Sequence, residues 1–159
     1  MNLMKKVKFL KEKRGVCACL DNSLFDNESK KIRIIIKTLE FFSNKIERFE
    51  GFVFVSINDK LIVDDLYRIN CSFELICVTK DLLKRDKEEK YKVIFNKEQI
   101  APVVNFILKN DLTFDGYGYN TNNEFLLSFV INDHDGSYIT FNDKIFEKEA
   151  YQQLIRNAL

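Results

Sequence analysis

The sequence is poor in the residues that most often carry chemistry or interrupt a fold. Its 159 residues include one histidine, one proline, five glycines and no tryptophan. With a single histidine, any Ser/His, Cys/His or histidine–metal mechanism has to use His134. The scarcity of proline and glycine argues against linkers. We therefore expect one ordered globular domain over residues 1–159.

Long hydrophobic runs are also missing, although 46% of the residues are hydrophobic. No apolar segment approaches the roughly 18 residues that a membrane-spanning helix needs. The chain reaches charged residues at Lys5 and Lys6, before the core of a signal peptide can form. The sequence therefore predicts a cytoplasmic protein without membrane contact.

The four cysteines do not have the spacing of a zinc site. Cys17 and Cys19 are separated by one residue, and Cys71 and Cys77 by five. Structural zinc sites use separations of two to four residues. Disulfides are not needed in an apolar domain of this size, so we expect free, buried thiols that behave as small hydrophobic side chains.

The remaining ligand motifs also fail. A calcium loop through Asp133 needs an oxygen ligand two positions earlier, where Ile131 stands. The pair Gly116 and Gly118 lacks the third glycine of the dinucleotide-binding fingerprint. We interpret the segment around His134 as a turn between two strands. The sequence thus predicts no catalytic residue, no metal ion and no cofactor.

Hydrophobic periodicity predicts an α+β fold, a mostly antiparallel sheet with about three helices packed on it. Apolar residues at three- and four-residue steps indicate a helix over 27–49. Asn96 and Gln99 form a helix-start signature for a second helix to Lys109. A third helix spans 143–157, and residues 80–90 form a charged connector or short helix. Alternation predicts strands over 52–57, 61–63, 72–79, 91–95, 112–119, 124–131 and 137–141. The first twenty residues fit either a helix or a hairpin through Gly15, and we expect the hairpin.

Charge is distributed unevenly along the chain. Residues 1–51 have twelve Lys or Arg against seven Asp or Glu, a net charge of +5, whereas residues 52–159 have a net charge of −4. The segment 110–143 contains six acidic residues and no Lys or Arg. An acidic segment of this kind complements and steers a basic partner.

Acidic and aromatic residues share one face of the strand predicted over 112–119. Its two-residue period places Asp115, Tyr117 and Tyr119 on the same side. Tyrosines provide large contact area with a polar tip. We therefore predict a partner-binding surface made of Asp115, Tyr117, Tyr119, Asp133, Asp135 and Tyr138.

In its size, its lack of catalytic residues and its acidic stretch from Asp111 to Asp143, the chain resembles bacterial immunity proteins, which neutralise a cognate toxin, often a nuclease. The resemblance implies a non-enzymatic inhibitor that covers a basic site on its protein partner with an acidic, tyrosine-bearing sheet. It implies no particular fold, because immunity proteins span unrelated folds.

Two alternatives from other classes stay open. The first is a small enzyme with a dispersed active site, in which His134 and Asp115 are the acid/base candidates. The second is an oligomerising structural module whose fifteen phenylalanines cover a subunit interface. The basic N-terminus, residues 5–14, is the one segment suited to phosphate. Because the rest of the chain is acidic, we expect no direct binding of nucleic acid.

Overall fold

The computed structural model describes residues 7–13, 15–80, 87–133 and 136–159. Within these residues the chain forms eight strands and four α-helices. The strands are β1 (Lys8–Glu12), β2 (Gly15–Asp21), β3 (Arg48–Ser56), β4 (Ser72–Lys80), β5 (Lys87–Phe95), β6 (Phe114–Tyr119), β7 (Phe125–Asp133) and β8 (Gly136–Phe141). The helices are α1 (Glu28–Ser43), α2 (Lys60–Arg68), α3 (Ile100–Lys109) and α4 (Lys148–Ala158).

The strands form one antiparallel sheet in the order β1-β2-β8-β7-β6-β3-β5-β4. The strands β3 and β6 pair in the middle of this order, and β1 and β4 are the two edges. The α+β class and the antiparallel sheet are confirmed, with four helices in place of about three. The N-terminal hairpin is confirmed as well, because Glu12 of β1 pairs with Gly15 of β2.

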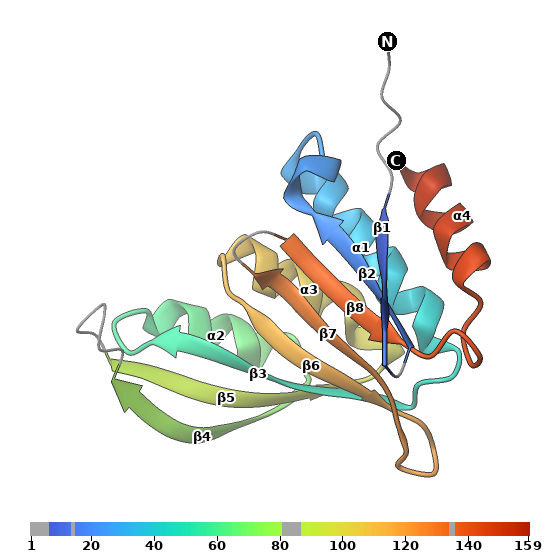
Figure 1. The fold of residues 1–159 in the computed structure, drawn as a ribbon. Coiled ribbons are helices and arrows are strands. Elements are labelled where there is room, and N and C mark those ends of the chain that lie inside the picture. The colour runs from blue at the N-terminus through green and yellow to red at the C-terminus, as the bar shows by residue number, and fades with distance from the viewer. Residues whose placement is uncertain (1–6, 14, 81–86, 134–135) are drawn as a thin grey trace.

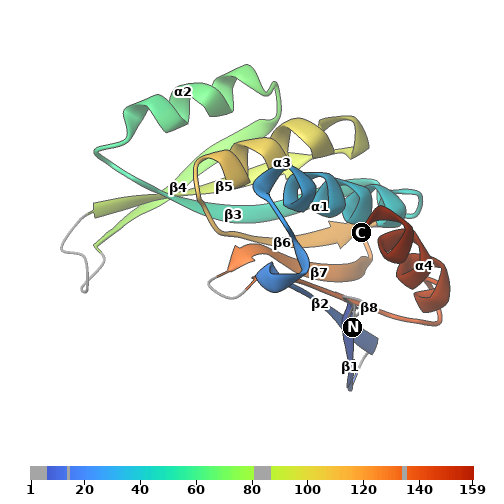
Figure 2. The ribbon, with the colours of Figure 1, turned by 90° about the horizontal axis from the view of Figure 1, so that it is seen from above.

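The four α-helices of the described residues lie on one face of the sheet, and none of them covers the other face (Figures 1 and 2). The strands alternate accordingly. In β6, the residues Phe114, Gly116 and Gly118 are buried toward the helices, whereas Asp115 and Tyr117 are exposed on the opposite face. The two faces of this sheet therefore have different environments.

Phenylalanine fills the core between the sheet and the helices. On α1, Phe42 is completely buried, and its ring centroid lies 4.9 Å from those of Phe141 and Phe146. In the middle of the sheet, Phe49 stacks on Phe95 at 5.1 Å. Eight of the fifteen phenylalanines are buried in this way: Phe42, Phe49, Phe95, Phe106, Phe114, Phe129, Phe141 and Phe146.

The helix predicted over 27–49 is shorter in the structure. Its start is confirmed, because the Asn27 side chain caps α1 by accepting a hydrogen bond from the amide of Lys30 at 2.8 Å. Its end is wrong, because α1 ends at Ser43 and Phe49 belongs to β3. Phe49 is buried in the core from β3, as it would be from a longer helix. Apolar periodicity alone therefore does not distinguish a helix from a strand at this position.

The strand predicted over 61–63 is wrong, because these residues belong to α2. Leu66 is buried, and Ile62 and Val63, which lie four and three residues before it, are half-buried on the same side. A helix brings the three side chains together, whereas a strand would divide them between two faces. The β preference of Ile and Val is thus overridden by tertiary packing.

The second predicted helix and the three strands after it are confirmed with shifted ends. Asn96 and Gln99 form the predicted capping box, which leads through a short 3-10 helix (Lys97–Gln99) into α3. The terminal helix begins at Lys148 and not at residue 143, because Asn142 starts a turn in which its carbonyl accepts from the amide of Phe146 at 3.0 Å. In the predicted connector 80–90, residues from Lys87 onward form β5, and 81–86 lie outside the described residues.

Candidate functional site: the helix-free face of the sheet

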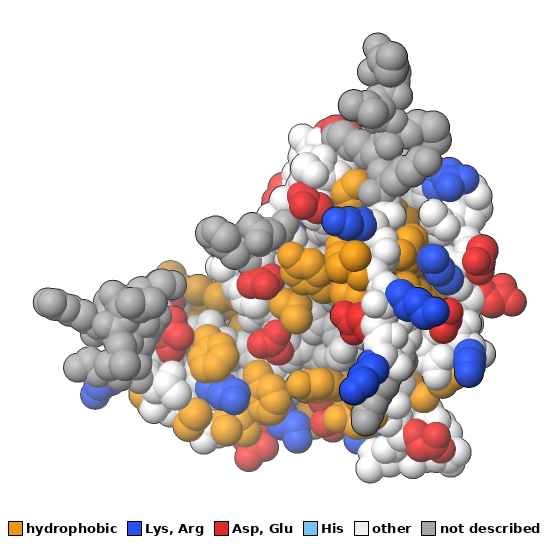
Figure 3. Space-filling model, viewed as in Figure 1, with side chains coloured by type: hydrophobic (Ala, Val, Ile, Leu, Met, Phe, Trp, Pro, Cys, Tyr) orange, Lys and Arg blue, Asp and Glu red, His pale blue; other side chains and the backbone are white. Residues whose placement is uncertain are grey.

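An open groove of about 650 Å³ crosses the sheet face that has no α-helix. We call this whole side of the sheet the helix-free face. Six residues from four strands that line its groove are Phe52, Phe54, Lys90, Asp115, Tyr117 and Tyr138. Figure 3 views this face directly and shows hydrophobic side chains over its middle, with basic and acidic side chains interspersed. The groove therefore has an aromatic floor with charges of both signs around it.

Strand β3 supplies the aromatic floor because its segment from Phe52 to Val55 is apolar on both faces. Its residues Val53 and Val55 are buried against the helices. The alternate positions, Phe52 and Phe54, point the other way, and Phe54 is 40% exposed. A solvated sheet face ordinarily carries polar residues at such positions. Two phenylalanines at such positions are therefore unusual for a sheet face that no helix covers.

A lysine from the neighbouring strand lies over these rings. Lys90 of β5 is the register partner of Phe54, and its Nζ lies 4.4 Å from the centroid of Phe52 and 5.7 Å from that of Phe54. These distances are within the range of cation–π attraction. The Lys90 stem therefore covers part of the aromatic surface and holds a positive charge at the middle of the groove.

Further charges on this face are paired. Arg48 donates from Nε to Glu50 at 2.8 Å, and its guanidinium lies 4.5 Å from the centroid of the Tyr119 ring. Lys92 of β5 places its Nζ 3.9 Å from the same Glu50 carboxylate. Because β3 and β5 contribute these cations to the same side of the sheet as Asp115, the helix-free face is mixed in charge and not uniformly acidic. Segment 110–143 contributes only some of the residues of that face, and β3 and β5 contribute the others.

The structure brings four of the six predicted binding residues to this face. Asp115 and Tyr117 line the groove from β6, and Tyr138 lines it from β8. Tyr119 follows on the same side of β6, against the ring of Phe125 at 6.3 Å. The residues Phe52, Phe54, Lys90 and Phe125 were not predicted. The run of apolar residues from Phe52 to Val55, which leaves neither face of the strand polar, is the signal that could have identified the first two.

The other predicted residues are placed elsewhere or are not described. Asp133 ends β7, where it pairs with Gly136 in the hairpin that leads to β8. Asp135 and the enzyme candidate His134 lie outside the described residues. Asp111, from the acidic segment, occupies a turn with a φ of +52° and accepts a hydrogen bond from Asn132 at 3.1 Å. The described acids of that segment are therefore divided between strands β6 and β7 and the loops.

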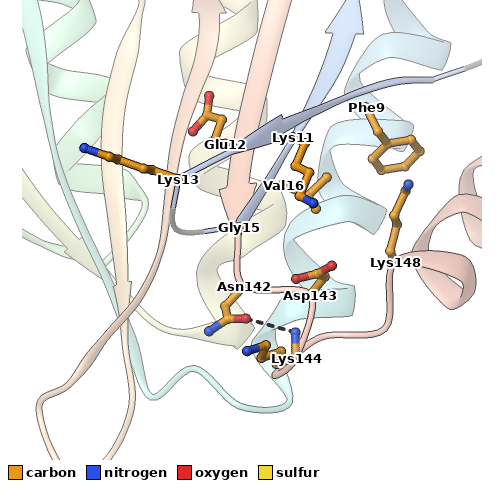
Figure 4. Close-up of a pocket in the computed structure, with 10 residues that line it drawn as sticks. All are labelled: Phe9, Lys11, Glu12, Lys13, Gly15, Val16, Asn142, Asp143, Lys144 and Lys148. Carbon is orange, nitrogen blue, oxygen red and sulfur yellow. Dashed lines mark hydrogen bonds between the residues drawn. The ribbon is translucent and has the colours of Figure 1, made fainter.

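A second cavity, of about 710 Å³, lies beside the β1–β2 hairpin and contains lysines. Figure 4 shows Lys148 directed toward Phe9, whose ring centroid lies 5.1 Å from its Nζ. In the same view Lys13 points away from that pair, and the carboxylate of Asp143 lies on the side of the cavity between Lys11 and Lys148. The lysines do not converge on one point, so this cavity has no shared site for an anion.

The cysteines are free in the structure, but they are not all buried as predicted. Cys17 is buried, Cys19 and Cys71 are half-buried, and Cys77 is exposed on β4. Burial raises the pKa of the Cys19 thiol, with Cys17 adding to the effect, and burial also raises the pKa of the Cys71 thiol. Both thiols therefore stay protonated and weakly nucleophilic at neutral pH. Within the described ranges, His, Cys, Asp and Glu form no group of three or more that could hold a metal ion.

Comparisons with known proteins identify no relative of this chain. No family model, no curated protein and no solved structure matches it. Among the helices of the described residues, none is both long and apolar enough to cross a membrane. The function is therefore inferred from the helix-free face and its side chains.

Proposed function

We propose that this chain is a non-enzymatic, protein-binding inhibitor of the immunity-protein type, and that its helix-free face covers the active region of a toxin. The observation that supports the proposal best is the exposure of aromatic side chains on this face. Phe54 and Tyr117 are each 40% exposed, and Phe125 is 56% exposed. Aromatic residues with polar and charged neighbours are typical of the anchoring residues in protein interfaces.

The chemistry of the face suggests how such a partner is recognised. Buried aromatic contact supplies most of the affinity in an interface, whereas charge controls orientation and association rate. Asp115 provides an acidic contact for the basic surface that we propose on the partner, with a nuclease toxin as the leading example. Lys90 and Arg48 contribute charge of the opposite sign. We therefore expect the partner to carry acidic groups beside its basic site.

The proposal is tested by co-expressing the chain with the products of its neighbouring genes and isolating any equimolar complex. In that complex, Phe54→Ala and Tyr117→Ala should each raise the Kd by about tenfold or more, because each removes a central aromatic contact. The matched control is Tyr67→Ala, which removes an exposed tyrosine of α2 on the helix side of the sheet. It should leave the Kd and the inhibition of the toxin unchanged.

Charge is tested separately with Asp115→Lys. This variant should slow association with a basic partner, and the difference from the original protein should shrink as salt is added. Stopped-flow or biosensor kinetics at two salt concentrations measure the effect. The proposal is wrong if no product of a neighbouring gene binds. It is also wrong if the Kd of a bound partner is unchanged by both aromatic substitutions.

A further inference from the structure

The two edge strands of the sheet are built differently. The strand β1 has five residues, KFLKE, of which three are charged. The strand β4 has nine residues, and Glu74 is the one charged residue between Ser72 and Thr79. Short, lysine-bearing edges discourage pairing with another strand, whereas long apolar edges favour it. By length and composition β1 is protected and β4 is not, and the one irregularity of β4 is a β-bulge between Leu75 and Cys77 in its pairing with β5.

The exposed side chains of β4 are mainly aliphatic. Leu75, Ile76 and Val78 are 44–50% exposed. On one side β4 pairs with β5, and the structure places no described strand on its other side. The backbone N–H and C=O groups directed to that side are therefore available to pair with a further strand.

Helix α2 extends the apolar surface on the helix side of the same edge. Its residues Leu61 and Tyr67 are 81% and 68% exposed. The Tyr67 ring packs edge-on against Phe73 of β4, with centroids 4.7 Å apart, so the helix surface and the strand edge are continuous. Phe73 and Leu75 pair with the helix-side positions Val93 and Tyr91 of β5.

We propose that β4 pairs antiparallel with β4 of a second copy of this chain, which joins the two sheets into one across a two-fold axis. Antiparallel pairing of identical strands has this symmetry, so the same patch serves both partners. The five exposed side chains of β4 and α2 together present on the order of 600 Å² per chain, against about 800 Å² per partner in a standard interface. Backbone and neighbouring atoms of the edge supply the remainder.

A second copy fits this surface better than an unrelated protein does. Homodimer interfaces are more apolar than transient ones, and this edge has a single acidic residue among aliphatic neighbours. Pairing about the middle of β4, near Cys77, keeps the two Glu74 residues about 20 Å apart, because the residue opposite Glu74 lies six positions further along the strand. The same arrangement brings the two exposed Cys77 residues close to the axis.

The proposal is tested by sedimentation of the full chain over a range of protein concentrations. The original protein should form a dimer. The double variant Leu75→Lys and Val78→Lys should weaken it on the order of a hundredfold, because four lysines would meet in a desolvated interface. Leu10→Lys is the matched control, since Leu10 is 46% exposed on the opposite edge strand β1. It should dimerise as the original protein does.

Two further measurements keep the result independent of a failure to fold. Circular dichroism and urea denaturation should show that the double variant is folded, and Tyr67→Lys on α2 should weaken the dimer without changing β4. Diamide, which takes two electrons and two protons from a pair of thiols, should link the dimer through Cys77. Cys77→Ser should abolish the link, and Cys71→Ser should retain it.

A protein that is monomeric at all concentrations would overturn the proposal. So would a dimer that survives the double lysine substitution or is lost in the Leu10→Lys control. The interface proposed here does not use the helix-free face. Phe54→Ala and Tyr117→Ala should therefore leave the dimer intact, and a failure of the toxin-inhibitor proposal is distinguishable from a failure of this one.

Discussion

The two ends of the sheet are covered to different extents by helices. At the end that contains β8, α1 and α4 bury Phe42 and Tyr151 completely. At the end that contains β4, the helix is α2, and it leaves Leu61 81% exposed. The same antiparallel sheet thus has a closed end, where the core is complete, and an open end, where apolar surface stays accessible. The difference suggests that stability resides at the closed end and association at the open end.

The largest expected difference between the ends is in the free energy of unfolding. Phe42→Ala should lower it by about 3–5 kcal/mol, because the substitution leaves a cavity among buried aromatic rings. Leu75→Ala on β4 should lower it by less than about 1 kcal/mol, since that side chain is already half exposed. Urea denaturation in dilute protein measures both. Equal losses would contradict the division of the sheet into a closed and an open end.

The second expected effect concerns the junction of the two ends, where β3 pairs with β6. A Cβ on Gly51 would lie 2.3 Å from the carbonyl oxygen of Asp115 and 2.4 Å from the Phe114 ring. Gly51→Ala should therefore lower the free energy of unfolding by about 1–3 kcal/mol. Gly118→Ala should lower the free energy of unfolding by less. Its Cβ would lie 2.9 Å from Cδ1 of Ile46 and 3.0 Å from Cγ of Leu127, and these are side-chain atoms that can shift. Thermal or urea denaturation of the two variants compares them, and a larger loss for Gly118 would contradict this account.

The smallest expected effect is a difference in alkaline stability. Burial raises the pKa of Tyr91 at the open end to about 12, with the Glu89 carboxylate adding to the effect, and burial also raises the pKa of Tyr151 at the closed end. An unfolded tyrosine loses its proton near pH 10.0. The stabilisation is therefore complete below about pH 10 and is lost as pH rises through the folded pKa.

Variants of the two tyrosines separate their contributions. Tyr151→Phe should remove more of the alkaline decrease in unfolding free energy than Tyr91→Phe, because Tyr151 is completely buried. At neutral pH, Tyr151→Phe also loses the contact of its hydroxyl with Thr38 at 3.2 Å. Urea denaturation from pH 8 to above pH 12 measures both effects, because the two variants separate only as the pH passes the folded pKa of Tyr91. If the two variants have the same pH dependence, unequal burial is not its cause.

The elements that the sequence predicts well are those with a local cause. The Asn27 cap and the Asn96–Gln99 capping box begin their helices in the structure, because side-chain oxygens meet nearby amides within the same turn. The alternation along β6 places Asp115 and Tyr117 on one face, because residues two positions apart in a strand point the same way. The errors have long-range causes. Residues 61–63 are helical because α2 packs Leu66 into the core. The strand predicted from residue 52 begins at Arg48, because residues 48–51 pair with β6 and residues 49–51 also pair with β5.

The candidate site shows the same division between local and long-range information. The sequence by itself determined the class of fold, the position of most strands and the shared face of Asp115, Tyr117 and Tyr119, because two- and 3.6-residue periods are properties of neighbouring residues. Tertiary structure alone decided the strand order, in which β3 lies between β6 and β5 and β4 forms the edge. That order places Lys90, two phenylalanines and Asp115 in one groove and leaves an aliphatic strand edge open. Strand order depends on contacts between residues far apart in the chain, which no local period encodes.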